Sequence, residues 1–150
     1  VVAWHRDYTY WDHVGPPELA TCWIALDDAT SDNGCMYVIP GSQRWALNFR
    51  REEVDNDDPD WVLKHADIPP AASREPVSCE VKAGHCHFHH CLLLHGSPGN
   101  STDRPRRSYI LHLMPGNIRR LGDSWNPRMA KVEEVEVGET IKGPSYPELV

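Results

Sequence analysis

The sequence predicts an all-β domain, either a sandwich or a jelly roll, from two observations. Short apolar runs of strand length recur along the chain, and clusters of Gly, Pro, Asn, Asp and Ser separate them. Almost no stretch shows the 3.6-residue periodicity of an amphipathic helix. Many short strands joined by turn signals are typical of two facing sheets. A chain of 150 residues is long enough to form one such domain with a real core.

Five runs of the sequence carry the predicted strands. The first two, TCWIALDDA (21–29) and GCMYVIPGS (34–42), flank the turn cluster TSDNG, so we expect them to form an antiparallel pair. The other three are PVSCEVKAG, HCHFHHCLLLHGS and RRSYILHLMP. We expect breaks at Gly84, near Cys91 and at the turn-rich stretch PGNSTDRP.

Two segments are less regular. Residues 44–76 are polar and acidic, which predicts a long loop insertion with at most a short turn near 61–64. Residues 116–150 form a tail that Pro and Gly interrupt repeatedly. We interpret 1–150 as a single domain. Because the chain starts inside a candidate motif, without an initiator Met, we expect it to be the C-terminal portion of a longer protein.

Composition argues against several classes of binding partner and of structural framework. The net charge of −7 argues against a nucleic-acid groove and against an anionic membrane surface. No apolar run approaches the ~18 residues of a membrane span, and no signal-peptide pattern opens the chain, so a cytoplasmic location is expected. The five cysteines are odd in number and lack CxxC spacing, so neither a disulfide framework nor a zinc ribbon is indicated.

The stretch WHRDYTYW (4–11) contains the first candidate metal ligands, His5 and Asp7. On an extended strand, residues i and i+2 point to the same face, so the imidazole and the carboxylate would lie side by side. An isolated HxD is more often a surface pair in a polar loop. A metal site therefore requires a third ligand from elsewhere in the chain.

The third ligand is sought in a tract that contains five histidines: His85, His87, His89, His90 and His95. One interpretation is a zinc site that also uses Cys86 and Cys91, but structural zinc normally draws on two separate pairs of ligands, whereas this tract is a single dense run. His95 differs because Gly-Ser follows it directly and a basic cluster comes about eleven residues later. A strand ending at His95, a tight turn, and a strand returning from Arg106 would bring a guanidinium close to the metal.

Such an arrangement has a chemical purpose. Two histidines and one carboxylate leave three positions open on a non-heme Fe(II), enough for a bidentate keto acid and dioxygen together. The far carboxylate of the keto acid then needs an anchor, which a guanidinium with a neighbouring hydroxyl supplies. Arg106 and Ser108 alternate correctly for that role on one strand face. The alternative for Arg106 is a solvated strand-end arginine, as we expect for Arg104 and Arg107.

Three stretches, in this order and at this spacing, resemble the phytanoyl-CoA dioxygenase family of Fe(II)/2-oxoglutarate-dependent oxygenases: WHRDYTYW, TCWIALDDATSDNGCMYVIPGSQRW and HCHFHHCLLLHGSPGNSTDRPRRSY. The tail segment GETIKGPSYPEL is also similar to C-terminal segments of that family. The resemblance implies a double-stranded β-helix (jelly roll) that lacks the N-terminal part of the full family fold.

The resemblance also implies roles for individual residues. His5, Asp7 and His95 match the iron ligands of the family, and Arg106 matches the arginine that binds the distal carboxylate of 2-oxoglutarate. Ser97 and Trp23 match positions that help to line the co-substrate site. The remaining histidines of the tract are interpreted as residues that line or flank the pocket: His87, His89 and His90, with His90 expected to approach it most closely.

The activity implied by the resemblance is hydroxylation of an unactivated C–H bond in a small organic substrate, using Fe(II), 2-oxoglutarate and O2 and releasing succinate and CO2. A small-molecule substrate, rather than nucleic acid or membrane, is the expected partner. Two alternatives remain open from the residues: a cupin-like metal enzyme that does not use 2-oxoglutarate, and a non-catalytic metal-binding domain. Neither the identity of the substrate nor the oligomeric state is encoded in a readable way.

Overall fold

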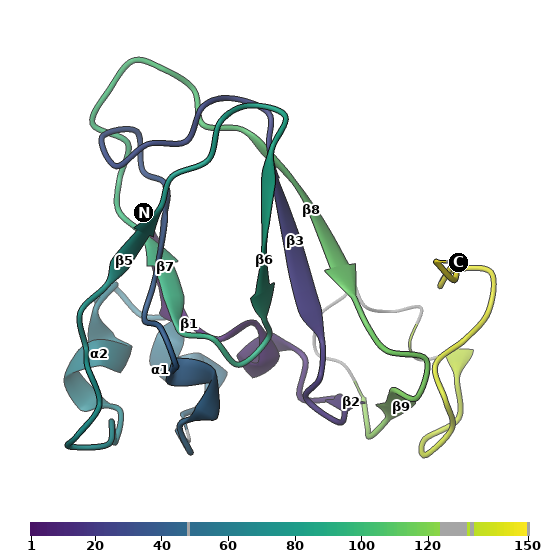
Figure 1. Ribbon diagram of the computed structural model, residues 1–150. Helices are drawn as coiled ribbons and strands as arrows, with labels where there is room; N and C mark the ends of the chain where they lie inside the picture. Colours follow the sequence, from purple (N-terminus) through teal and green to yellow (C-terminus); the bar gives the residue numbers. More distant parts are fainter. Residues whose placement is uncertain (48, 124–131, 133, 150) are drawn as a thin grey trace.

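Two facing β-sheets that diverge from one end form the body of the molecule (Figure 1). The computed structural model describes residues 1–47, 49–123, 132 and 134–149. The first sheet has the order β1 (Val2–His5), β7 (His95–Ser97), β4 (Met36–Val38) and β5 (Val77–Cys79). The second has the order β6 (Cys86–His90), β3 (Ala20–Ala25) and β8 (Ser108–Leu113). The predicted all-β jelly-roll class is confirmed.

The first two predicted strands do not pair with each other. β3 lies between β6 and β8 in one sheet, whereas β4 lies between β7 and β5 in the other. The connection is too long for a tight hairpin, and it crosses between the sheets. Its path is fixed locally by Asn33, whose side-chain amide donates to the carbonyl of Asp28 (2.7 Å), and by an isolated bridge between Ala29 and Val81. The expected antiparallel pair was therefore wrong.

The segment around His95 differs from expectation in the same way. β7 begins at His95 and includes Gly96 and Ser97, so the predicted tight Gly-Ser turn is a strand. The chain then crosses to the other sheet and enters β8 at Ser108. The predicted break near Cys91 is confirmed, because a turn separates β6 from β7. The strand predicted to end at His95 therefore begins there, and the sheet that each strand joins depends on long-range packing.

Short helices occupy part of the segment that was expected to be a loop. A 3-10 helix, η2 (Ser42–Arg44), is followed by α1 (Arg51–Val54) and α2 (Trp61–His65). α2 coincides with the expected turn near 61–64, while α1 was not expected. Val54 and Val62 are buried against Ile39 and Leu94, which places both helices on the outer side of the first sheet (Figure 1). Residue 48 lies outside the described residues.

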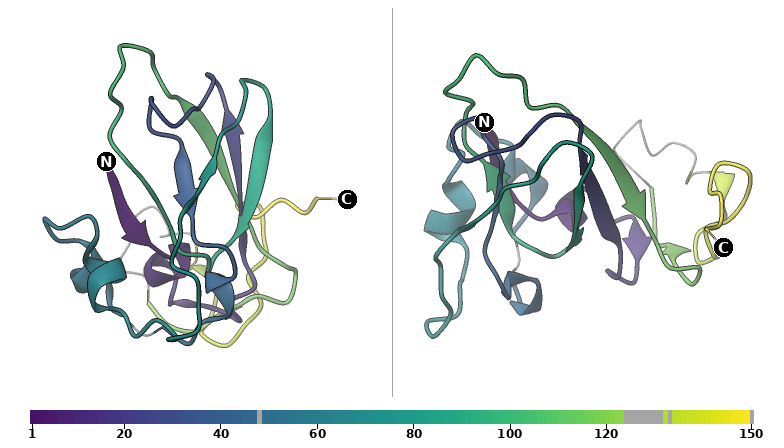
Figure 2. Two further views of the ribbon diagram at one scale, coloured as in Figure 1. Left: turned by 60° about the vertical axis from the view of Figure 1, so that its left-hand side comes forward. Right: turned by 45° about the horizontal axis from the view of Figure 1, so that its top comes forward.

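The described part of the tail contributes to a second hydrophobic core. Ile118 and Ile141 pack with Trp11 and Val14, and all four side chains are buried. A small sheet pairs β2 (Val14–Gly15) with β9 (Arg119–Arg120) at this end of the molecule. The N-terminal strand and the C-terminal segment lie on opposite sides of the structure (Figure 2). Residues 124–131, 133 and 150 of the expected tail lie outside the described residues.

A third core joins the two sheets. Trp23 and Ala25 of β3 pack with Met36 of β4 and with Cys35, and each is at least nine-tenths buried. This contact holds the inner faces of the sheets together at the end nearest Arg106. Among the described residues, no helix is both long and apolar enough to cross a bilayer.

Candidate metal centre

His5 and Asp7 lie at the junction of a strand and a 3-10 helix. β1 ends at His5, and Asp7 is the first residue of η1 (Asp7–Tyr10), so the two are not on one continuous strand as expected. Arg6 between them still has extended dihedral angles (φ −114°, ψ 136°). The carboxylate therefore remains beside the imidazole, with Oδ1 of Asp7 3.7 Å from Nε2 of His5.

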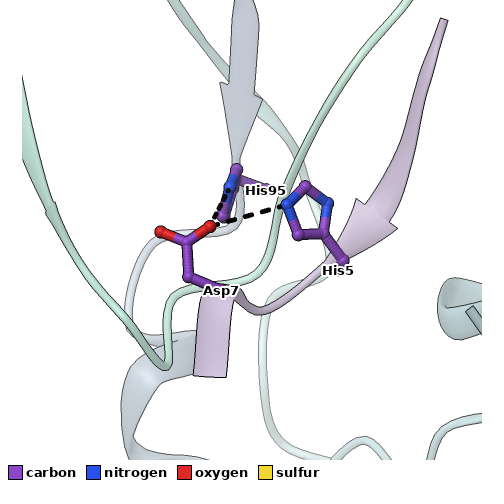
Figure 3. A group of neighbouring side chains, drawn as sticks. All are labelled: His5, Asp7 and His95. Atoms are coloured by element: carbon purple, nitrogen blue, oxygen red, sulfur yellow. Dashed lines mark ion pairs between the residues drawn. The ribbon is translucent and has the colours of Figure 1, made fainter. Parts of the chain in front are cut away.

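His95 reaches the same carboxylate oxygen from the neighbouring strand. In the register of β1 and β7, His95 lies directly opposite His5, and the centres of the two rings are 4.2 Å apart. Nε2 of His95 is 3.5 Å from Oδ1 of Asp7. Figure 3 shows one oxygen of Asp7 directed at both imidazoles while the other points away. Among the described residues these three form the only cluster of potential metal ligands, with one ligand atom from each lying within 4.8 Å of the others.

The hydrogen bonds of the two histidines leave Nε2 free for a metal. Nδ1 of His5 lies 2.7 Å from the carbonyl oxygen of Ala3, and Nδ1 of His95 lies 2.9 Å from that of Leu93. A carbonyl only accepts hydrogen bonds, so each ring is assigned a proton on Nδ1. Nδ1–H to backbone carbonyl is the usual arrangement around metal-binding histidines.

Burial and the interactions among the clustered side chains both affect their pKa values. Burial lowers the pKa of His95, whose side chain is only 5% exposed, so this imidazole is neutral near pH 7. Burial alone would raise the pKa of Asp7, but its interactions with His5, His89 and His95 outweigh that effect and hold the pKa far below its ordinary value. The carboxylate is therefore charged. The Nε2 atoms of His5 and His95 and a carboxylate oxygen of Asp7 converge, and this set of nitrogen and oxygen ligands fits a divalent cation of the borderline type.

The three neighbouring arginines have different environments. Arg104 forms an ion pair with Asp32 (2.7 Å), and Arg107 forms one with Asp27 (2.8 Å), both at the surface. Arg106 has no hydrogen bond or ion pair within the part of the chain that the structure describes. Its guanidinium carbon lies 5.9 Å from the centre of the Trp23 ring. Arg106 is thus the arginine of this cluster that is available for an added carboxylate.

Strand pairing places the other expected co-substrate residues on inner faces. Trp23 is 3% exposed, and its ring stacks on that of His87 at 5.4 Å. Ser108 is paired with Ala25, two positions along β3 from Trp23, so both lie on the Trp23 face of the sheet. Ser97 is buried and lies two residues after His95, on the same side of β7. The structure brings Arg106, Trp23 and His87 together. It shows no hydrogen bond from the hydroxyl group of Ser97 or Ser108 to another described residue.

The histidine nearest to the ligand cluster is His89 rather than His90. His90 is exposed, and its Nδ1 accepts the backbone N–H of Leu92. His89 is 6% exposed, and its Nε2 lies 3.1 Å from Oδ2 of Asp7. The expectation for His90 was wrong because alternation along β6 directs 87 and 89 inward and 88 and 90 outward.

Two further residues at the cluster were not anticipated. The hydroxyl of Thr21 donates to Oδ2 of Asp7 at 2.6 Å, and Nδ1 of His112 lies 3.2 Å from the same hydroxyl. Both lie on strands of the second sheet, at 14 and 105 residues from Asp7 along the chain. Only the strand register could have indicated them.

Arg6 anchors the ligand-bearing segment. Its side chain is buried, and Nη2 donates to the carbonyls of Ser42 (2.6 Å) and Trp45 (2.9 Å). These carbonyls belong to the first residue of η2 and to the residue that follows η2. The bonds tie the His5–Asp7 turn to the first sheet, on the opposite side of the turn from the ligands.

Comparison with known proteins identifies the family. The family model described as phytanoyl-CoA dioxygenase (PhyH) matches residues 1–108, which contain His5, Asp7, His95 and Arg106. The chain belongs to the phytanoyl-CoA dioxygenase family. "Phytanoyl-CoA dioxygenase 1" of Oryza sativa subsp. japonica is 35% identical over 114 residues, covering 73% of this chain and 37% of the relative. The chain spans less than half the length of the curated relatives it matches.

Solved structures of other proteins share the fold of this chain. The non-heme alpha ketoglutarate dependent carbocyclase SnoK superposes with a TM-score of 0.69 at 23% identity, covering 97% of this chain and 55% of that one, which shows a shared fold. EvdO2 from Micromonospora carbonacea var. aurantiaca, solved in complex with 2-oxoglutarate, gives a TM-score of 0.57 at 28% identity, covering 85% and 49%.

Proposed function

We propose that this chain carries the metal and co-substrate sites of an Fe(II)- and 2-oxoglutarate-dependent dioxygenase that hydroxylates an unactivated C–H bond of a small organic substrate. The observation that carries the proposal is the convergence of Nε2 of His5, Nε2 of His95 and Oδ1 of Asp7, with both Nδ1 atoms directed at backbone carbonyls. Membership of the phytanoyl-CoA dioxygenase family and the 2-oxoglutarate complex of EvdO2 support the choice of metal and co-substrate.

In this proposal His5, Asp7 and His95 would hold Fe(II) through one ligand atom each, a ligand set that suits non-heme Fe(II) oxygenases. The bound iron, 2-oxoglutarate and O2 supply the oxidising chemistry, with release of succinate and CO2. Asp7 contributes the one negative charge among the three protein ligands and so partly neutralises the cation. The Nδ1 bonds of the two histidines fix the ring planes, so the ligand geometry exists before the metal arrives.

Arg106 is proposed to bind the distal carboxylate of 2-oxoglutarate. It is free of carboxylate partners among the described residues, and it lies over Trp23 on the inner side of the second sheet. A planar guanidinium binds a carboxylate through two parallel N–H donors. Trp23 and His87 then supply a flat, largely buried wall, while Ser97 and Ser108 offer hydroxyl groups that are available for hydrogen bonds. This assignment distinguishes the proposal from a cupin-like enzyme, which has no need of an anion site opposite the metal.

Succinate formation tests the function. The protein is supplied with Fe(II), ascorbate, 2-oxoglutarate and air, and the slow uncoupled formation of succinate is measured without knowledge of the substrate. We expect iron-dependent succinate formation in the wild type and none in His5→Ala. Equal succinate formation in both proteins would exclude the assigned centre. Once a substrate is found, a mass increase of one oxygen atom in the product would support hydroxylation over a cyclisation or an epimerisation.

A further inference from the structure

Three paired residues on neighbouring strands of the second sheet form a row of side chains that faces Asp7. Thr21 of β3 pairs with His89 of β6 on one side and with His112 of β8 on the other. Side chains of directly paired residues lie on the same face of a sheet. The three therefore form a polar row across the sheet, facing the ligand cluster on the first sheet.

The two residues of this row that hydrogen-bond to Asp7 both contact the same carboxylate oxygen. Nε2 of His89 (3.1 Å) and the hydroxyl of Thr21 (2.6 Å) both contact Oδ2, whereas Nε2 of His5 and of His95 face Oδ1. A carboxylate only accepts hydrogen bonds, so His89 carries its proton on Nε2 and donates it. Thr21 uses its single hydrogen for Asp7, so its oxygen accepts from Nδ1 of His112 (3.2 Å).

His89 gains no other polar contact at this position. Its side chain is 2% exposed, and its Nδ1 is buried without a hydrogen-bond partner among the described residues. Buried polar atoms are usually satisfied, so an exception indicates another constraint on the residue. An apolar ring would fill the same space without an unsatisfied nitrogen. The contact with Asp7 is therefore the feature that accounts for a histidine here.

We infer that His89 and Thr21, supported by His112, are positioning residues that hold Oδ2 of Asp7 away from the metal, so that Asp7 binds through Oδ1 alone. A carboxylate that bound through both oxygens would occupy one more position on the metal and leave fewer open for other ligands. This inference rests on the proposed metal centre and adds to it the reason that the centre keeps its open positions. Residues that orient metal ligands commonly change metal affinity about 10- to 100-fold when replaced.

Co(II) alone, added to the metal-free protein, tests this role without the substrate or the co-substrate. Its visible absorption responds to the number and geometry of its ligands, and its titration gives the affinity. We expect His89→Phe and Thr21→Val to bind Co(II) about 10- to 100-fold more weakly than the wild type and with an altered visible spectrum. We expect His89→Gln to recover affinity to within about tenfold and to restore the spectrum, because its amide nitrogen can donate from nearly the position of Nε2.

His90→Phe is the matched control and should bind Co(II) as the wild type does. His90 lies on the same strand, next to His89, but it is exposed on the opposite face, and its Nδ1 accepts from the backbone N–H of Leu92. If His89→Phe does not fold, Thr21→Val carries the test, because that change is nearly isosteric. Wild-type affinity and an unchanged spectrum in both His89→Phe and Thr21→Val would overturn the inference while leaving the metal centre intact. If the wild type does not bind Co(II), by contrast, both the proposed metal centre and the positioning role of His89 and Thr21 are contradicted.

Discussion

The guanidinium of Arg106 lies over the ring of Trp23, 5.9 Å from its centre, while the arginines on either side of it pair with aspartates at the surface. The three cations are close in sequence but differ in availability. Arg104 and Arg107 already have carboxylate partners, and a second anion would have to displace those partners. Arg106 has no carboxylate partner among the described residues and lies beside the buried ring of Trp23. A keto acid would therefore gain more binding energy from Arg106 than from either of the other two arginines.

Replacing Arg106 therefore tests co-substrate binding. Truncating one side of a partly buried charge pair typically costs about 2–5 kcal/mol. We expect Arg106→Ala to raise the apparent dissociation constant of 2-oxoglutarate by roughly thirtyfold or more, at ~1.4 kcal/mol per factor of ten. Arg106→Lys should restore only part of the affinity, because a point charge lacks the planar fork. Calorimetric titration of the metal-loaded protein measures both constants.

Arg104→Ala and Arg107→Ala are the controls for that experiment. Each removes one exposed cation of the same cluster, and exposed ion pairs contribute little energy. Both variants should bind 2-oxoglutarate nearly as tightly as the wild type. A weakened affinity in either control, with Arg106→Ala unaffected, would assign the carboxylate to a different arginine.

Asp7 should be required for metal binding because of its charge. Asp7→Asn keeps the shape of the side chain but removes the anion that balances a divalent cation. We expect it to lose nearly all Fe(II) affinity in anaerobic equilibrium dialysis, while the far-UV circular dichroism stays unchanged. Asp12→Asn, an exposed acid in the same segment, should bind as the wild type does. Full iron occupancy in Asp7→Asn would remove this residue from the ligand set.

Leu94 should be essential for stability rather than for chemistry. It is completely buried between the first sheet and the two short helices, one residue before His95. Leu94→Ala should lower the free energy of unfolding by about 2–5 kcal/mol through lost burial and a new cavity. Leu26→Ala, at a position that is 54% exposed, should change it by less than about 0.5 kcal/mol. Urea denaturation followed by tryptophan fluorescence compares the two.

Acid should destabilise the metal-free protein through its buried imidazoles. Burial, with smaller contributions from His89 and His95, lowers the pKa of His87 from 6.5 to about 4. Between those two values the unfolded chain binds a proton at this site that the folded chain does not, so the free energy of unfolding falls as the pH falls from 6.5 towards 4. Burial lowers the pKa values of His95 and His112 as well, which adds to the same trend.

The contribution of His87 can be isolated by replacing it. Urea unfolding of the metal-free protein at about pH 7.5 and about pH 5 should show a smaller loss of stability in His87→Phe than in the wild type. An equal loss in both proteins would show that this histidine does not titrate differently on folding.

The sequence predicts the candidate ligands of the site but not the residues that surround them. His5, Asp7, His95 and Arg106 lie in short motifs, and the structure brings the first three into one cluster. Thr21 and His112 join that cluster through strand register, which a local pattern does not report. The strands at 21–29 and 34–42 were recognised by composition, but their assignment to different sheets follows from the long-range pairing of β3 with β6 and β8. Likewise, His89 rather than His90 lies beside Asp7, because neighbouring residues along a strand point to opposite faces of the sheet.

The most direct test of the account is anaerobic titration of 2-oxoglutarate into the Fe(II)-loaded protein, followed by the visible charge-transfer absorption of a chelated keto acid. The wild type should develop this absorption up to one equivalent of iron per chain. His95→Ala, which removes one of the two nitrogen ligands, should retain its fold but show neither stoichiometric iron nor the absorption. The same absorption at the same iron stoichiometry in His95→Ala would contradict the central claim that His5, Asp7 and His95 form the metal centre.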